Sequence, residues 1–222
     1  MGAAVPSTGL GRPLLRGWFH LVAFVLSLPA GAFLLGASGT TTARAGAAVF
    51  ASAVAVLFGV SGSYHRGRWR PRARLRMKRL DHATIFVMIA GSYTPFCVLV
   101  LDGAAAAVLL VAVWVGAAVG VVMATTGLAE KRIVGLASYL ALGWIALAAL
   151  PQLVDHLGAG GFILLVAGGA TYTLGAIGLG LRWPDPFPRV FGYHEVWHTM
   201  VVVAVVCHYL VVLSVLQRTA PT

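Results

Sequence analysis

Residues 104–126 read AAAAVLLVAVWVGAAVGVVMATT and contain no charged residue. A membrane-spanning helix needs about 20 mostly apolar residues, because a helix rises about 1.5 Å per residue and the hydrocarbon core is about 30 Å thick. This stretch is therefore long enough to cross a membrane as one helix. A partly exposed helix of a soluble domain would instead carry charged residues along its outer face.

Six further blocks of the chain share this apolar character and are joined by short connections. The seven predicted spans are residues 18–36, 45–64, 83–101, 104–126, 133–150, 162–181 and 193–216. The whole chain of 222 residues is 59% hydrophobic and only 10% charged, whereas soluble domains carry about 25% charged residues. We therefore predict an all-α integral membrane protein with seven transmembrane helices.

The basic residues are distributed very unevenly between alternate connections. Of the 16 Lys and Arg residues, all but Arg44 and Arg218 fall before the first predicted span or in the second, fourth and sixth connections. Since cytoplasmic loops carry the excess of Lys and Arg, the N-terminus is predicted inside and the C-terminus outside. The predicted organisation is a cytoplasmic segment (1–17), a membrane domain (18–216) and an external tail (217–222), in a multi-pass protein of the plasma membrane.

The second connection, residues 66–79, is the most basic part of the chain and reads RGRWRPRARLRMKR. We predict a solvated loop that helps to set the topology. Contact with anionic lipid headgroups is compatible with this role, since each basic residue near the membrane surface contributes about 1 kcal/mol. The stretch contains no nucleic-acid-binding motif, so membrane lipids rather than nucleic acids are the expected partners.

Polar residues gather at the inner ends of three predicted spans. His65 ends the second span, Asp81 precedes the third, and His194 and His198 begin the seventh. The predicted orientation places all four at one depth, where ionisable side chains are costly and often functional. His194 and His198 are four residues apart and so face the same way on a helix, as do Ser61 and His65.

Three imidazoles at one depth form a donor set that zinc accepts, with tetrahedral geometry and a fourth position left for water. Asp81 is suited to hold that water or to support a ligand from behind, and Ser61 to hydrogen-bond Asp81 or the water. The alternative is that these histidines pack at the membrane interface without a metal, as a single histidine near a helix end usually does. His65, His194 and His198 are therefore candidate zinc ligands, and Asp81 and Ser61 are candidate catalytic residues beside them.

Three separated segments resemble motifs of the hemolysin III family, the bacterial branch of the progestin and adipoQ receptor group. They are SGSYH at 61–65, LDHA at 80–83 followed by AGSYTPF at 90–96, and HEVWH at 194–198. The resemblance implies seven helices, zinc on the three histidines, and a zinc-bound water near Asp81 with Ser61 beside it. It also implies a role in membrane lipid or energetics homeostasis. Through a wider superfamily that includes alkaline ceramidases, it implies zinc-dependent hydrolysis of lipid amides.

Other functions fit parts of the same pattern. A structural zinc would suit a non-catalytic membrane sensor or regulator, and a pore-forming, haemolytic protein is a further alternative. HEVWH also matches the HExxH motif of metalloproteases, with Glu195 as general base. However, Asp102, the acidic residue that such an intramembrane protease would use, is predicted on the opposite side of the membrane. The remaining histidines are interpreted as interfacial (His20, His156), packing (His82) and a buried hydrogen-bonding partner (His208).

Overall fold

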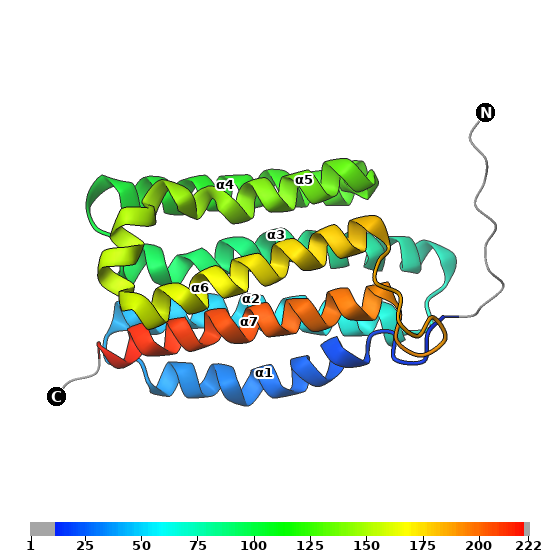
Figure 1. The fold of residues 1–222 in the computed structure, drawn as a ribbon, viewed down its shortest axis with the longest axis horizontal. Helices are drawn as coiled ribbons and strands as arrows, with labels where there is room; N and C mark the ends of the chain where they lie inside the picture. The colour runs from blue at the N-terminus through cyan, green and yellow to red at the C-terminus, as the bar shows by residue number, and fades with distance from the viewer. Residues whose placement is uncertain (1–11, 220–222) are drawn as a thin grey trace.

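The computed structural model describes residues 12–219, which form seven α-helices and two short 3-10 helices in one bundle (Figure 1). In chain order the elements are α1 (Trp18–Gly36), α2 (Thr41–Arg66), α3 (Pro71–Leu99), α4 (Gly103–Thr126), η1 (Leu128–Glu130), α5 (Arg132–Gly143), η2 (Trp144–Ala149), α6 (Leu150–Leu181) and α7 (Tyr193–Gln217). Within the described range the sole β-type contact is an isolated bridge between Phe187 and Phe191. The predicted all-α class is therefore confirmed. The predicted terminal segments, 1–17 and 217–222, lie partly outside the described residues.

The starts of α2 and α3, which are both earlier than predicted, have local chemical reasons. The Thr40 hydroxyl accepts the backbone N–H of Ala43 at 3.1 Å and so caps α2. Pro71 stands at the start of α3, where a missing N–H costs nothing because that position has no intrahelical acceptor. The prediction of a loop throughout residues 66–79 is therefore wrong: residues 71–79 are helical, and Arg and Lys are good helix formers.

The helices are arranged so that α2 and α3 form the centre of the bundle. The most extensive contacts join α2 with α3, α6 with α7, α3 with α4, and α1 with α2. In Figure 1, α4 and α5 lie along one side of the bundle and α1 lies along the opposite side. The α2–α3 contact is close at Gly91, where an added Cβ would lie 2.5 Å from the Cβ of Ala53. Small residues of this kind allow helices in membranes to pack closely.

The outer surface of α4 shows why this bundle needs an apolar solvent. Five valines that are each more than half exposed follow one face of the helix, at positions 108, 111, 115, 119 and 122. The opposite face, which includes Val113 and Ala117, is buried against the bundle. Six helical stretches within the described range are long and apolar enough to cross a membrane, by length and composition. A membrane protein is therefore supported.

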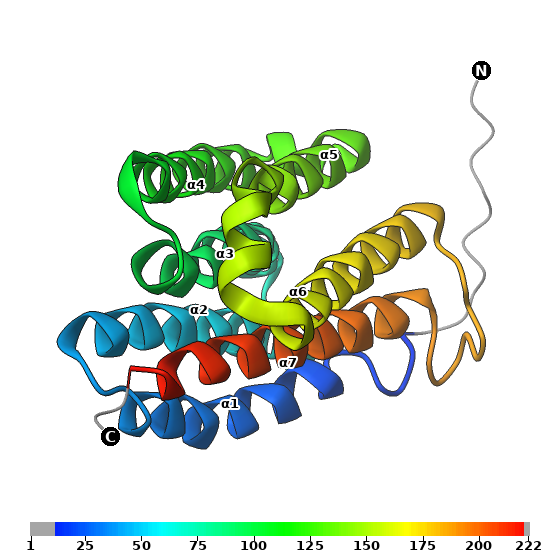
Figure 2. The ribbon, with the colours of Figure 1, turned by 60° about the vertical axis from the view of Figure 1, so that its left-hand side comes forward.

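The stretch from Arg132 to Leu181 counts as one of these six, although two predicted spans, 133–150 and 162–181, fall within it. The backbone leaves the helical region at Gly158, whose φ of 68° favours a residue without a Cβ. Figure 2 shows that the first turns of α6 run across the end of the bundle before the rest of α6 returns along α7. The predicted count of seven spans is thus not confirmed by helix length alone.

Candidate metal centre

The structure brings three of the predicted site residues together at one end of the bundle. His65 lies at the end of α2, whereas His194 and His198 lie on the first turns of α7. Each histidine offers one ring nitrogen, and these three nitrogens lie within 4.8 Å of one another. His65 and His198 are buried, and His194 is half-buried. The predicted spacing of four residues on α7 therefore places both imidazoles beside the third one from α2.

The geometry of this set fits a metal ion. The Nε2 atoms of His65 and His194 lie 3.3 Å apart. Two nitrogen ligands at about 2.0–2.1 Å from a tetrahedral zinc are also separated by about 3.3–3.4 Å. Neutral imidazole nitrogens are common ligands of zinc and of other transition metals. The three histidines could therefore hold a metal ion, although the donor set alone does not identify which metal.

Asp81 and Ser61 lie beside the three histidines. The Asp81 Oδ2 atom lies 3.7 Å from the Nε2 atom of His65. Ser61 is buried on α2, one turn before His65, and lines the same cavity as Asp81. The structure therefore places both predicted catalytic residues next to the candidate metal centre.

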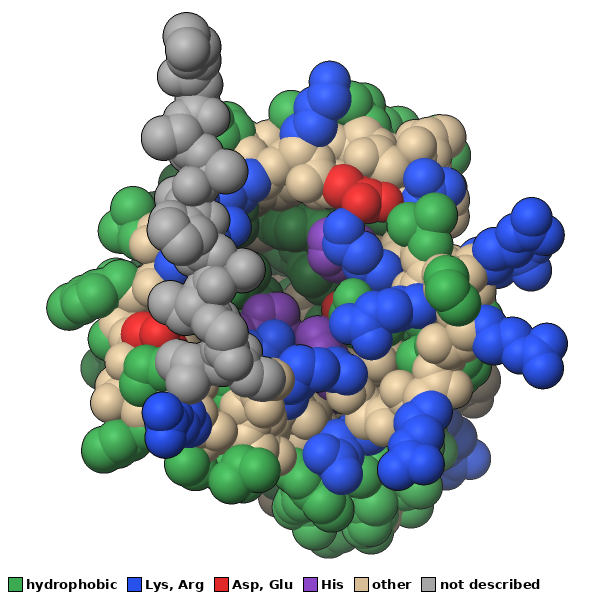
Figure 3. All heavy atoms as spheres, turned by 90° about the vertical axis from the view of Figure 1, so that its right-hand side faces the viewer, with side chains coloured by type: hydrophobic (Ala, Val, Ile, Leu, Met, Phe, Trp, Pro, Cys, Tyr) green, Lys and Arg blue, Asp and Glu red, His purple; other side chains and the backbone are tan. Residues whose placement is uncertain are grey.

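A cavity of about 400 Å³ extends from this centre into the bundle. Ser61, Asp81, His194 and His198 contribute to its wall at the histidine end. Most of the remaining wall is apolar and comes from α3, α5 and α6, with residues such as Ile85, Met88, Ile89, Leu136, Leu140 and Leu165. Figure 3 shows the molecule hollowed at the end where α3 and α7 begin, with histidines inside and Lys and Arg side chains around the opening. The site therefore combines polar groups with room for an apolar ligand.

The environment of Glu195 argues against the metalloprotease alternative. Glu195 is 0% exposed, and its Oε2 atom accepts the backbone N–H of Gly192 at 2.9 Å. Its other oxygen is paired with the guanidinium of Arg16. Asp102 precedes α4 without a side-chain cap hydrogen bond, and the length of α3 places it about 27 Å or more from Asp81. Both carboxylates of the protease interpretation are therefore occupied elsewhere or distant from the histidines.

His20 of α1 is a site neighbour that the sequence interpretation missed. It is 3% exposed rather than interfacial, and its ring stacks on that of His198 with centroids 3.9 Å apart and an interplanar angle of 4°. Neither ring nitrogen of His20 has a hydrogen-bond partner among residues 12–219. Its depth could have indicated this place, because His20 is the third residue of the first predicted span and His198 is the sixth residue of the last.

The other three histidines lie in two different surroundings. His82 and His208 both contribute to the cavity wall, and the Nδ1 atom of each is buried without a hydrogen-bond partner in the described part of the chain. The hydrogen bond expected for His208 is thus not found at this nitrogen. His156 lies at the other end of the bundle, where its Nε2 atom is 3.5 Å from Oδ2 of Asp102. None of these three belongs to the three-histidine set.

Comparisons with known proteins match nearly the whole chain. A family model described as Haemolysin-III related matches residues 9–209. The chain is 30% identical over 186 residues to Hemolysin-3 of Bacillus cereus, a match that covers 82% of this chain and 81% of that protein. It is also 30% identical over 186 residues to the Hemolysin-3 homolog of Bacillus subtilis, with 82% and 84% of the two chains covered. All five predicted site residues lie within the matched range.

Proposed function

We propose that this chain, which belongs to the hemolysin III family, is a zinc-binding membrane protein that acts on membrane lipids. The observation that carries the proposal is the placement of three histidines and Asp81 at the polar end of a largely apolar cavity. A cavity of this kind suits a lipid whose polar group meets the histidines. The proposed role is in membrane lipid homeostasis, in the plasma membrane.

The proposed topology has seven spans, with the N-terminus inside. Between residues 132 and 149, α5 and η2 together rise about 30 Å, which matches the hydrocarbon core. After Gly158, the remainder of α6 is long enough to cross again. The basic connections then lie on the cytoplasmic side. There the first turns of α3, with Arg72 and Arg76 exposed, are proposed to contact anionic lipid headgroups.

The proposed reaction is the hydrolysis of a lipid amide or ester. A zinc ion held by His65, His194 and His198 would lower the pKa of water and polarise a carbonyl group. Asp81 is proposed to accept the proton of the attacking water, because its carboxylate lies beside the histidines. Ser61 would hydrogen-bond Asp81 or the carbonyl oxygen on which charge develops. The apolar cavity would hold an acyl chain and exclude bulk water from the site.

A structural metal is the second candidate, and the origin of the ligands supports it. His65 belongs to α2 and the other two histidines to α7, so a bound ion would join the ends of two helices that share few contacts otherwise. A protein of this kind would sense or regulate the membrane without turning over a substrate. The Asp81→Asn variant described next decides between a catalytic and a structural metal.

The deciding experiment compares the purified protein with its Asp81→Asn variant. The protein is expected to contain about one zinc per chain by elemental analysis and to hydrolyse a lipid amide in mixed micelles. Asp81→Asn is expected to retain zinc and thermal stability but to lose hydrolysis. Asp155→Asn, at the other end of the bundle, is the matched control and should behave as the wild type. Equal hydrolysis by wild type and Asp81→Asn would reject the reaction, and metal-free wild type of full stability would reject the site.

A further inference from the structure

Glu195 is a buried carboxylate between two proposed metal ligands, His194 and His198, yet it points to other partners. One oxygen accepts the N–H of Gly192, which caps the start of α7, and the other pairs with Arg16. A buried carboxylate is costly unless it is paired and hydrogen-bonded. Both oxygens of Glu195 are used in this way, so the side chain is held in one position.

Arg16 belongs to a segment, residues 12–17, that crosses the same end of the bundle. Arg12 donates to the backbone carbonyl of His65 at 2.8 Å. The N–H groups of Leu14 and Leu15 donate to the carbonyl oxygens of Arg189 and Val190 at 3.0 and 3.1 Å. The segment therefore contacts the end of α2 and the connection that leads into α7.

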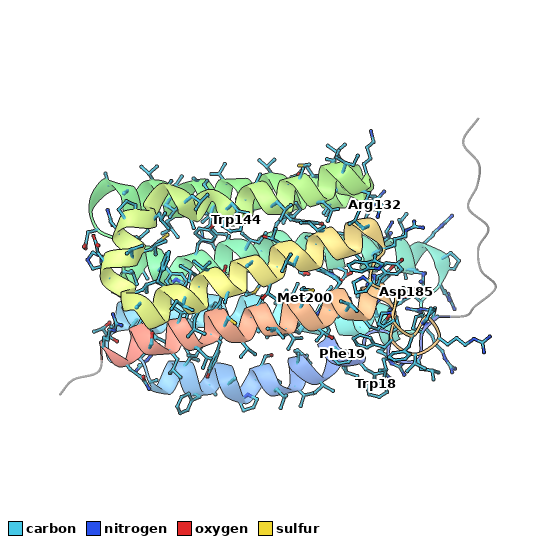
Figure 4. All side chains as sticks on the ribbon, viewed as in Figure 1. Trp18, Phe19, Arg132, Trp144, Asp185 and Met200 are labelled. Atoms are coloured by element: carbon cyan, nitrogen blue, oxygen red, sulfur yellow. The ribbon has the colours of Figure 1, made fainter. Side chains whose placement is uncertain are left out.

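The side chains that follow this segment add to the same junction. Phe19 packs edge-on against Phe191, with ring centroids 5.6 Å apart. Figure 4 shows Trp18 and Phe19 at the end of the bundle where Asp185 also lies. Asp185 in turn accepts the N–H of Tyr193 at 2.9 Å, the first residue of α7. The start of α1 and the α6–α7 connection are therefore joined at the place where α7 begins.

We propose that Arg16 and Glu195 are a positioning pair for the metal centre, an inference that rests on the proposed metal function. The pair fixes the first turns of α7, which carry His194 and His198, while Arg12 in the same segment holds the carbonyl of His65. Glu195 thereby acts through the backbone of α7 and not as a general base.

The physical need for such a pair follows from where the ligands lie. His65 is the second-last residue of α2, and His194 is the second residue of α7. The terminal turns of a helix lack several backbone hydrogen bonds and fray easily. Three imidazole nitrogens converge only if both helix ends are held, so an anchor that joins them preorganises the site.

The test uses the full-length protein in detergent, stripped with a chelator and titrated with Co²⁺ and then Zn²⁺. Tetrahedral Co²⁺ absorbs visible light in a pattern that reports the geometry of its ligands. Arg16→Met and Glu195→Gln are expected to weaken Co²⁺ binding by about 10–100-fold, as the loss of groups that orient ligands usually does, and to change the absorption pattern. Arg16→Lys retains the charge and should restore most of the affinity. Glu130→Gln is the matched control, because Glu130 pairs with Lys78 and Arg79 and not with the helix ends that carry the three histidines.

Each outcome decides the inference. Wild-type affinity and spectrum in folded Arg16→Met and Glu195→Gln would overturn the positioning role while leaving the metal site intact. If these two variants do not fold, Glu195→Asp decides instead. Its carboxylate is one methylene shorter and cannot reach both partners, so weakened binding with normal melting supports the inference and unchanged binding overturns it. Wild-type protein that binds no Co²⁺ or Zn²⁺ would reject the proposed function and the inference together.

Discussion

The close packing of α2 against α3 predicts that Gly91→Ala destabilises the protein. An alanine Cβ at position 91 would lie 2.5 Å from the Cβ of Ala53 on the facing helix. Two carbon atoms attract best at about 3.5–4.0 Å, so the helices would have to separate locally by about 1–1.5 Å. No flexible side chain can absorb this overlap, because both contacting atoms are attached directly to the backbone.

The expected cost of this overlap is about 1–3 kcal/mol, the usual range for overpacking a well-packed interior. The effect should extend to the candidate metal centre, since the two helices that pack together here also carry His65 (α2) and Asp81 (α3). The assay is thermal melting of the purified protein in detergent, with and without added Zn²⁺. Gly91→Ala is expected to melt at a lower temperature in both conditions.

Two further variants test whether this specific contact is responsible. Gly36→Ala is the matched control, because an added Cβ there meets no atom within 4 Å. Ala53→Gly removes the opposing methyl group, so the double variant Gly91→Ala with Ala53→Gly should regain much of the stability lost by Gly91→Ala alone. A Gly91→Ala protein as stable as the wild type, or a double variant without any rescue, would refute the reasoning.

Three other predictions concern the centre and its surroundings. Chelation should lower the melting temperature of the wild type but not that of His198→Ala, which lacks one proposed ligand. His156→Ala at the other end should respond like the wild type; equal responses in all three would contradict the site. His20→Phe should keep the stack on His198 and melt no lower than the wild type, because it removes two buried nitrogens that have no partners among the described residues. His20→Ala loses the stack and should melt lower than the wild type. Melting curves that rank the two variants in the reverse order would disprove this. Hydrogen bonds from Lys78 and then Arg79 lower the pKa of Glu130 below its ordinary value of 4.5, so its stabilising effect is complete above that value and is lost as the pH falls through the lowered pKa. Glu130→Gln should therefore melt below the wild type at pH 7, and the difference should shrink as the pH is lowered below 4.5; a constant difference would contradict the assignment.

The apolar stretch 104–126 was sufficient to predict the fold class. In hydrocarbon, every backbone N–H and C=O group must be satisfied within the segment, so a long apolar run has to be helical. The start of α3 at Pro71 was not predicted, because interpretation of residues 66–79 rested on their charge rather than on their helix-forming tendency. The number of spans between Arg132 and Leu181 also depends on the turn at Gly158, which hydropathy does not reveal.

The candidate metal centre likewise combines residues that are close in the sequence with residues that are far apart in it. The spacing of His194 and His198 is local, and four residues along a helix already place both imidazoles on one face. The convergence of His65 on His194 joins residues 129 positions apart, and the Arg16–Glu195 pair joins residues 179 positions apart. Motif resemblance and depth suggested the first of these but not the second, nor the stacking of His20. Sequence alone determined the helical fold class and the candidate ligand types, because these follow from short-range chemistry. Only the tertiary structure decided which helix ends meet, because helix packing depends on the shapes of all contacting faces at once.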